Sequence, residues 1–497
     1  MNLLYRAPAS AEGTVSKLLN IMHSKGLFEK CTVITQTVDN KDYYDDSIFH
    51  EIKASYGYQC SYSELVDSKF WPEIDGSIWE KLNKYKSTAF NMMCRKSHIH
   101  IMNYEEMEQE YIQHVRFWKY VLDSDSINCV FFVTMPHWPW EYVLYALAKV
   151  MRIPVLIETT SNVFPLFEVG TDIDNIGQNT HIVYNREKKK HNDLEGYSKE
   201  FYNRVKNMTT YTSPTNLNGR KEQREWVYNS FYKPYKLNFD DFLAICSGII
   251  KGNLGERLNG IVKKITVKKK IDRENRKYVS IEYLNDFVKD GIDNKEKYVY
   301  FAMQYFPESS VLPRGGVFQN QLLAIRLLSR ALESMSVKLY VKEHWISDFR
   351  YKMFYDELLG LPNVVCLPTT TDTYSIIDSS MAVASMTGTC MMEAIIRGIP
   401  VLNFAQNDLV NAPGVFRVKD YEDIISAVDT ISKDDFSISE EEVKQYFAII
   451  ERTHPVGYLD IDNIKDDNMI GKFIDDSCDL LCKFIESGMD EGFVFAK

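Results

Sequence analysis

The sequence predicts an α/β protein with two doubly wound domains, and three observations lead to this prediction. Short apolar runs alternate with amphipathic segments in two separate parts of the chain, roughly residues 1–175 and 291–430. Alternation of this kind is typical of parallel sheets covered by helices. Between them, residues 176–290 are polar and carry little strand pattern, as expected of a mainly helical insertion or linker. The length of 497 residues is sufficient for two such domains and further helices.

The first part of the chain opens with a strand pattern and contains one strong buried strand. INCVFFVT is a buried strand by composition, and the stretch after it has the apolar spacing of an amphipathic helix. The predicted strands are residues 2–5, 31–35, 127–134 and 153–158, and the predicted helices are 14–23 and 139–150.

The third part repeats the alternation and is predicted to form a second domain. Its expected strands are residues 298–303, 337–341, 364–367, 381–384 and 401–404, with helices at 318–332 and 348–359. The remaining residues, 431–497, read as helices that pack back on the first domain.

The most informative stretch is residues 381–404, which predicts strand, small polar loop, helix, glycine turn and strand. The first turn of a helix exposes backbone N–H groups, and the helix dipole favours an anion there. A carboxylate one turn into the helix lies on the same face as the loop and suits a ribose diol. These residues therefore predict a site for a nucleotide or nucleotide sugar, formed by Ser385, Thr387, Gly388, Thr389 and Glu393.

Two further strand-to-helix junctions carry polar groups at the same predicted edge. Gln304 and Glu308 follow the strand at 298–303, and Lys342 and His344 follow the strand at 337–341. Alternation along the strand puts Lys342 and His344 on one side. Because ligands of such folds bind beyond the carboxyl ends of the strands, the three junctions predict one crevice. An alternative for Gln304 and Glu308 is a cap on the next helix or a pair with Arg314.

The segments QYFPESSVLPRGGVFQNQLLAIRLLSRAL, LYVKEHW, LPNVVCLP and ASMTGTCMMEAIIRGIPVLNF resemble the capsule polysaccharide biosynthesis family. That family comprises bacterial glycosyltransferases of the GT-B fold, two Rossmann-like domains facing a cleft, and includes transferases of Kdo and related acidic sugars. The likeness covers roughly residues 298–405, and it implies a donor-binding domain at 291–430 and an acceptor-side domain at 1–175. It implies that His344 and the loop of Thr387, Gly388 and Thr389 contact the donor nucleotide, and that Glu393 approaches its ribose or base.

One residue departs from the family pattern. Trp345 follows His344 where the family usually has Pro. Proline would fix the backbone at this point, whereas Trp345 offers a stacking surface.

The resemblance implies transfer of a sugar from a nucleotide-linked donor, with a CMP-linked acidic sugar such as Kdo or a nonulosonic acid as the expected substrate. The acceptor would be a bacterial surface glycan or glycolipid, and neither metal nor cofactor is expected. Deprotonating the acceptor hydroxyl requires a general base in the first domain. The candidates, in order of preference, are Glu158, His137, Glu12 and Glu141.

Composition restricts the other partners. A net charge of −11 argues against general nucleic-acid binding. No apolar run is long enough for a membrane span, and the irregularly spaced cysteines, nine in number, fit reduced thiols of a cytoplasmic protein without a metal site. The basic stretch from Lys263 to Lys277 predicts either a solvated helix face or peripheral contact with an anionic inner-membrane surface.

Three other functions fit the same pattern. One is a polyol-phosphate transferase acting on CDP-glycerol, and another is a nucleotide-sugar epimerase, which needs no separate acceptor. The last is a glycan-binding subunit without catalytic activity.

Overall fold

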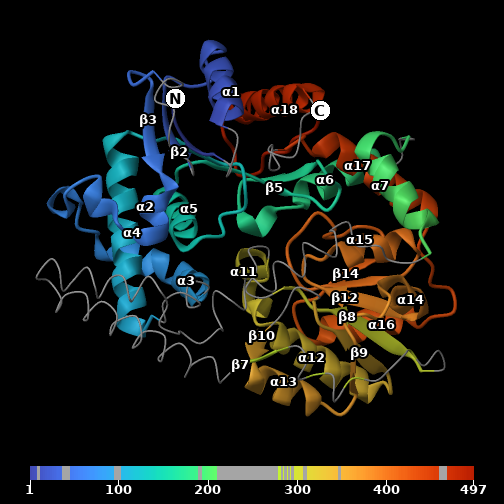
Figure 1. Ribbon diagram of the computed structural model, residues 1–497. Helices are drawn as coiled ribbons and strands as arrows, with labels where there is room; N and C mark the ends of the chain where they lie inside the picture. Colours follow the sequence, from blue (N-terminus) through green and yellow to red (C-terminus); the bar gives the residue numbers. More distant parts are fainter. Residues whose placement is uncertain are drawn as a thin grey trace, which may run out of the picture.

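The computed structural model describes residues 1–7, 12–35, 45–94, 102–188, 193–209, 278–280, 296–305, 311–344, 349–457 and 467–497, with the single residues 284, 288 and 292. Two six-stranded sheets, each covered by helices on both faces, form two domains (Figure 1). Both chain termini lie in the first domain.

The first sheet has the strand order β3-β2-β1-β4-β5-β6. All its neighbouring strands are parallel except the last pair, where β6 runs antiparallel to β5. Its strands are β1 (Asn2–Arg6), β2 (Lys30–Thr35), β3 (Phe49–Lys53), β4 (Cys129–Phe132), β5 (Val155–Thr160) and β6 (Phe167–Gly170).

The second sheet has the order β11-β9-β8-β12-β13-β14, and every neighbouring pair is parallel. Its strands are β8 (Tyr298–Ala302), β9 (Lys338–Lys342), β11 (Val364–Leu367), β12 (Ala382–Ser385), β13 (Val401–Asn403) and β14 (Val415–Arg417). When its six strands are counted along the chain, both sheets follow the order 3-2-1-4-5-6 of the Rossmann fold. The predicted α/β fold with two Rossmann-like domains, the GT-B architecture, is confirmed.

Different helices cover the two faces of the first sheet. On one face, α3, α4 and α5 bury a core rich in Trp and Tyr. On the other face, α1 packs beside the C-terminal helix α18 (Figure 1). The helices of this domain are α1 (Glu12–Ser24), α2 (Ala54–Gln59), α3 (Gly76–Met93), α4 (Tyr104–Ser124) and α5 (Pro139–Met151), with short 3-10 turns at Tyr62–Glu64, Ser68–Phe70 and Ile173–Asn175.

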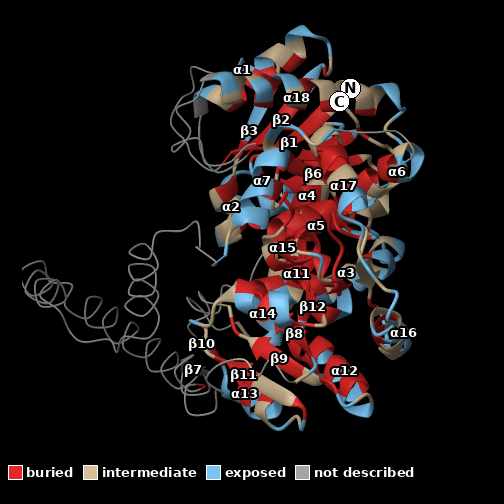
Figure 2. Cartoon of the chain, turned by 90° about the vertical axis from the view of Figure 1, so that its right-hand side faces the viewer, coloured by how far each residue is buried: buried red, intermediate tan, exposed pale blue. Residues whose placement is uncertain are grey.

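In the second domain, α12, α13 and α16 share a core on one face of the sheet, and α14 and α15 cover the other. The core under α15 continues into the first domain, and Figure 2 shows buried residues running from α5 through α11 and α15. The helices are α11 (Val311–Arg314), α12 (Gln321–Ser334), α13 (Lys352–Leu359), α14 (Thr373–Ser379), α15 (Thr389–Ile396) and α16 (Tyr421–Ile431), with a 3-10 turn at Gly316–Gln319.

The last two helices, α17 (Glu440–Thr453) and α18 (Asp467–Glu486), return to the first domain. α17 packs against α6 (Gln178–Glu187) and α7 (Gly196–Asn207), and the three lie side by side in Figure 1. In the described part of the chain, no helix combines the length and apolar character that crossing a membrane requires.

Some expected elements differ from those observed. The helix predicted at 348–359 begins only at Lys352, because Phe349–Tyr351 forms strand β10, which pairs with β7 (Tyr278–Ser280). The strand predicted at 153–158 begins at Val155, since Arg152 ends α5 in a left-handed conformation, and it continues to Thr160. Strands β3, β6 and β14 were not predicted. All three lie at or next to a sheet edge, where polar residues such as those of FHEIK hide the strand pattern.

Candidate functional site

Each sheet has one point where its strand order reverses, and ligands of Rossmann-like domains bind there, beyond the carboxyl ends of the strands. In the first domain this switch point lies between β1 and β4, and in the second it lies between β8 and β12. Of the predicted donor residues, Ser385 is the last residue of β12 and Gln304 lies two residues beyond the end of β8. Both are therefore at the second switch point.

Gln304 bridges the second switch point. Its Nε2 donates to Ser385 Oγ at 3.0 Å, and Ser385 Oγ donates to Ala302 O at 2.8 Å, so the ends of β8 and β12 are joined. The backbone of Gln304 is held in turn by Gln321 and by Arg350. Gln304 is therefore a buried brace between the ends of the two strands.

Gly388 lies directly on this brace. A Cβ built on Gly388 would be 2.5 Å from Gln304 Nε2, so the loop approaches the amide only because the side chain is absent. Gly388 is also the N-cap residue of α15, and as a glycine it has no side chain with which to cap the helix. In the first turn of α15 the N–H of Met391 donates to Gly388 O at 3.1 Å, and the helix dipole still favours an anion at the start of the helix.

The hydroxyl of Thr387 gives a second indication of a ligand. Thr387 is 8% exposed, and its Oγ1 has no hydrogen-bond partner among the described residues. A buried hydroxyl without a partner is costly. Beside the start of α15, an acceptor such as a phosphate oxygen would satisfy it.

Lys342, which is half-buried, and Glu393, which is buried, are two ionisable groups near the loop that influence each other electrostatically. Lys342 Nζ donates to Thr371 O at 2.9 Å and to Thr373 Oγ1 at 2.6 Å. Burial lowers the pKa of Lys342 to about 8, although Cys390, Asp372 and Glu393 oppose the shift. Burial also raises the pKa of Glu393 to about 7, against the effects of Arg204, Lys342, Tyr374 and Arg397. Both groups change charge near neutral pH.

Glu343 organises the loop that carries His344. Its carboxylate forms a buried ion pair with Arg350 and accepts from Tyr355 Oη at 3.1 Å and from the backbone N–H of His344 at 2.8 Å. The ring of His344 lies 6.2 Å from that of Tyr305 at the end of β8. Arg350 was not predicted, although it links the β8 and β9 loops through Gln304 O and Glu343.

Several predicted positions lie outside the described residues. These are Glu308, Trp345 and the basic stretch from Lys263 to Lys277. The backbone of Glu12 begins α1, but its side chain also lies outside the description.

The switch point of the first domain is filled by an ion pair. Arg6 Nε, at the end of β1, donates to Glu141 Oε1 at 2.6 Å, and both side chains are buried. Glu141 Oε2 accepts the backbone N–H groups of His137 and Trp138 at 3.1 and 3.2 Å. Burial alone would raise the pKa of Glu141, but Arg6 and His137 bring it below its usual value. Glu141 therefore caps α5 as a carboxylate.

His137 lies at the carboxyl end of β4 and is 24% exposed. Its Nδ1 is 2.7 Å from Met135 O, which can only accept, so the neutral ring carries its proton on Nδ1. The basic lone pair is then on Nε2, as a general base requires.

Glu158, the preferred candidate for the general base, lies in a different part of the first domain. It shares a face of β5 with Leu156, whose core includes α1 and α18, and it is fully buried. Burial, with a smaller effect from Asp476 of α18, raises the pKa of Glu158 to about 8. Neither carboxylate oxygen has a partner among the described residues. Glu158 thus lies under the C-terminal helix, apart from His137 and Glu141.

Three contacts between the domains were not predicted. Arg314 Nη2 donates to both oxygens of Glu168 at 2.6 Å, within the buried interface. Ser161 Oγ donates to Asp408 Oδ2 at 2.9 Å, and Thr389 Oγ1 donates to Asn162 Oδ1 at 2.8 Å. The partners are more than a hundred residues apart in the chain, so no local pattern could reveal them.

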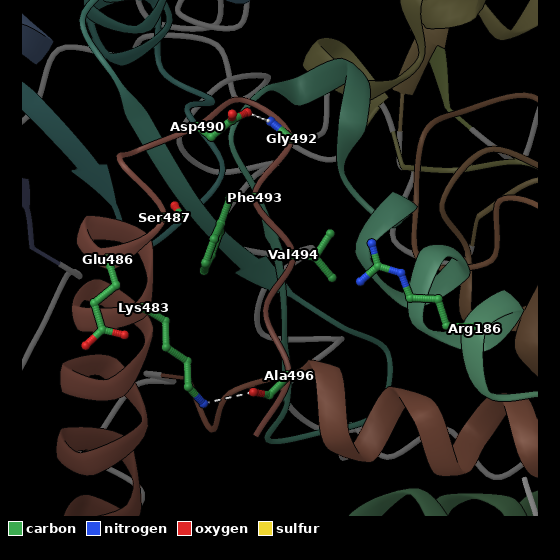
Figure 3. A pocket seen from close by; sticks show the side chains of 9 residues that line it. All are labelled: Arg186, Lys483, Glu486, Ser487, Asp490, Gly492, Phe493, Val494 and Ala496. Carbon is green, nitrogen blue, oxygen red and sulfur yellow. Dashed lines mark hydrogen bonds between the residues drawn. The ribbon is translucent and has the colours of Figure 1, made fainter.

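A hollow on the surface lies away from both switch points. It opens between α18, α6 and the C-terminal tail (Figure 3), and none of the predicted site residues lines it; its lining is Arg186, Lys483, Glu486, Ser487, Asp490, Gly492, Phe493, Val494 and Ala496. Within the described ranges, no group of three or more His, Cys, Asp or Glu side chains is placed to hold a metal ion.

No protein-family model and no curated protein matches the chain. Among solved structures it is similar to UDP-GlcNAc 2-epimerase from Methanocaldococcus jannaschii, at 11% identity and a TM-score of 0.24, covering 89% of this chain and 98% of that one. It is also similar to KpsC, a beta Kdo 2,7 transferase from Thermosulfurimonas dismutans, at 10% identity and a TM-score of 0.27, covering 66% of this chain and 79% of that one. A third similar structure is MnaA of S. aureus with UDP, at 9% identity and a TM-score of 0.26, covering 98% of this chain and 97% of that one. At TM-scores this low, the similarity carries no argument about the fold. The fold assignment rests on the strand order of the two sheets.

Proposed function

We propose that the protein is a metal-independent glycosyltransferase that binds a nucleotide-linked sugar at the switch point of its second domain. The observation that carries this proposal is the start of α15 with a glycine as its N-cap, next to the buried hydroxyl of Thr387, which has no partner among the described residues. Lys342 adds a cationic group and Glu393 a carboxylate at the same edge. A phosphate and a ribose diol are the ligand groups that this combination suits.

The resemblance to the capsule polysaccharide biosynthesis family supports a CMP-linked acidic sugar as the donor. In such a transfer, the acceptor oxygen attacks the anomeric carbon, and the bond from that carbon to the phosphate oxygen breaks. CMP leaves with the electron pair. The start of α15 and Lys342 would stabilise the charge that develops on the leaving phosphate.

The acceptor, a surface glycan or glycolipid, would be activated from the first domain. His137 is the base that the geometry supports, because its neutral tautomer has a basic Nε2 at the carboxyl end of β4. The acceptor proton passes to this nitrogen as the new glycosidic bond forms. Glu141, whose carboxylate already serves Arg6 and two backbone N–H groups, would keep the segment in place.

A nucleotide screen tests the proposal. Thermal unfolding is followed with CMP, CDP, UDP and GDP, since a ligand that binds only the folded protein raises its stability. The proposal expects the largest increase with CMP. A largest increase with CDP, together with turnover of CDP-glycerol, would identify a polyol-phosphate transferase, and conversion of a nucleotide sugar without acceptor would identify an epimerase. No increase with any nucleotide would contradict the proposal and favour a glycan-binding subunit.

His344 provides a more specific prediction. We expect His344→Ala to lower the rate of transfer at least about tenfold, because a charge-assisted contact with a leaving phosphate contributes roughly 1.5–3 kcal/mol. The measurement is kcat under saturating acceptor, with thermal unfolding as the control for folding. Unchanged kinetics in a folded variant would remove His344 from the site.

A further inference from the structure

Asn162, in the first domain, contacts the loop of the second domain to which the donor phosphate is assigned. Thr389 Oγ1 donates to Asn162 Oδ1 at 2.8 Å, and Asn162 Nδ2 lies 3.5 Å from the carbonyl oxygen of Thr387. The loop is therefore held from the opposite side of the domain interface.

The segment that carries Asn162 is itself well fixed. The backbone N–H of Ser161 donates to Leu166 O at 3.1 Å, which closes the turn after β5. Ser161 Oγ accepts from the N–H of Val163 at 3.2 Å and donates to Asp408 Oδ2 at 2.9 Å. Asn162 and Ser161 thus contact two different loops of the second domain, those after β12 and β13.

The single hydroxyl proton of Thr389 determines whether this residue can donate a hydrogen bond to a phosphate. A threonine hydroxyl has one proton, and that of Thr389 is donated to Asn162. Phosphate oxygens accept hydrogen bonds, so Thr389 cannot donate to them while this contact persists. The hydroxyl of Thr387, in contrast, has no partner among the described residues. The two threonines of the loop therefore have different tasks.

We propose that Asn162 and Thr389 form a positioning pair, which holds the loop so that Thr387 and the start of α15 face the donor phosphate. The proposal rests on the function proposed above and deepens it. Because the pair joins the two domains, the loop is braced only when the domains have this relative arrangement. Binding of the nucleotide is then coupled to the position of the first domain.

Three variants and a matched control test the pair. Asn162→Ala and Thr389→Val each remove one partner, and the double variant removes both. Thr389→Val keeps the volume of the side chain, so it keeps the test valid if Asn162→Ala does not fold. The control is Asn91→Ala, which removes another hydrogen bond between the domains, from Asn91 Nδ2 to Gln319 Oε1 at 3.1 Å.

The first readout is hydrogen exchange of the backbone amides of residues 386–390 without nucleotide. We expect faster exchange in Asn162→Ala and in Thr389→Val, no further increase in the double variant, and no change in Asn91→Ala. Equal exchange in Asn162→Ala and Asn91→Ala would overturn the pair.

The second readout is the affinity for CMP by calorimetry. We expect each single variant to bind about fivefold to tenfold more weakly, and the double variant to bind no more weakly than either. Additive losses would show that Thr389 donates to the phosphate directly and would overturn the proposal. If the unaltered protein binds no CMP, the proposed donor is wrong, whereas the exchange data still decide on the positioning pair.

Discussion

The two domains share one strand order, but different side chains occupy their switch points. In the first domain a charged side chain crosses from β1 to α5, and the carboxylate of Glu141 accepts the N–H groups of His137 and Trp138, just before that helix. In the second domain a neutral amide, Gln304, crosses from β8 to β12, and the N-cap residue of α15 is Gly388, which has no side chain to cap the helix. The same fold therefore leaves room for an anion in one domain and supplies its own anion in the other.

This difference explains how two domains of the same fold can have different roles, one in binding a phosphate and the other in holding a general base. A helix start with the carboxylate of Glu141 beside it repels a phosphate, and the neighbouring His137 is held there in one tautomer. A helix start with Gly388 at its N-cap attracts a phosphate strongly. The following variants are chosen to disturb one switch point while leaving the other intact.

The largest effect is expected from breaking the ion pair of the first switch point. Arg6→Met leaves the Glu141 carboxylate buried without its cation, which costs about 3–5 kcal/mol of the free energy of unfolding. Urea unfolding measures this loss, and calorimetry with CMP should show an unchanged affinity. A folded Arg6→Met protein that no longer binds CMP would contradict the assignment of the donor to the second domain.

A large effect on turnover alone is expected at His137. His137→Ala should lower kcat about a hundredfold, since a general base contributes roughly that factor or more, while the affinity for CMP stays the same. His23→Ala, at the end of α1, serves as the control. If kcat survives in His137→Ala, the base has to be sought at Glu12 or Glu158.

Glu158 allows a test of stability that separates it from the switch point. Its folded pKa of about 8 lies above its usual value of 4.5, so the fold favours the protonated form. Stability is therefore lost as the pH rises from 4.5 to 8, and the full penalty remains above that range. Glu158→Gln, which cannot ionise, should raise the free energy of unfolding at pH 9 by on the order of 2 kcal/mol.

The check on Glu158→Gln is urea unfolding at pH 5 and pH 9. The gain should be much smaller at pH 5, where the wild-type carboxyl group is protonated. Equal free energies of unfolding for the two proteins at pH 9 would mean that Glu158 is not buried as described.

The smallest expected effect is at Gly388. Gly388→Ala puts a methyl group 2.5 Å from the amide nitrogen of Gln304, so either the loop or the brace has to shift. We expect about a tenfold loss of CMP affinity, equivalent to about 1.4 kcal/mol. Gly13→Ala is the matched control, because nothing lies within 4 Å of its added Cβ. An equal affinity in both variants would show that the loop tolerates a side chain and does not contact the donor.

Local patterns were sufficient for most of the fold. Strands such as β4 and β12 are buried on both faces and appear as continuous apolar runs, so their positions and the polar residues that follow them were predictable. The edge strand β3 contains His50 and Glu51, which are exposed, and no such run marks it.

The candidate site was predictable only in part. The predicted donor residues follow their strands closely in the sequence, so the parallel strands place them together at one edge of the sheet. The partners that define their roles, such as Arg6 for Glu141 and Asn162 for Thr389, lie 135 and 227 residues away and become neighbours only through folding. For Glu158, the two-residue period of β5 places it on the face of Leu156, and this was a signal that the sequence contained.

The central claim is that an anionic ligand binds at the start of α15 and not at the start of α5. Hydrogen exchange with and without saturating CMP tests it directly on the unaltered protein. The account predicts slower exchange for the amides of residues 386–393 and no change for residues 135–141. Protection of residues 135–141 with none at 386–393 would contradict it.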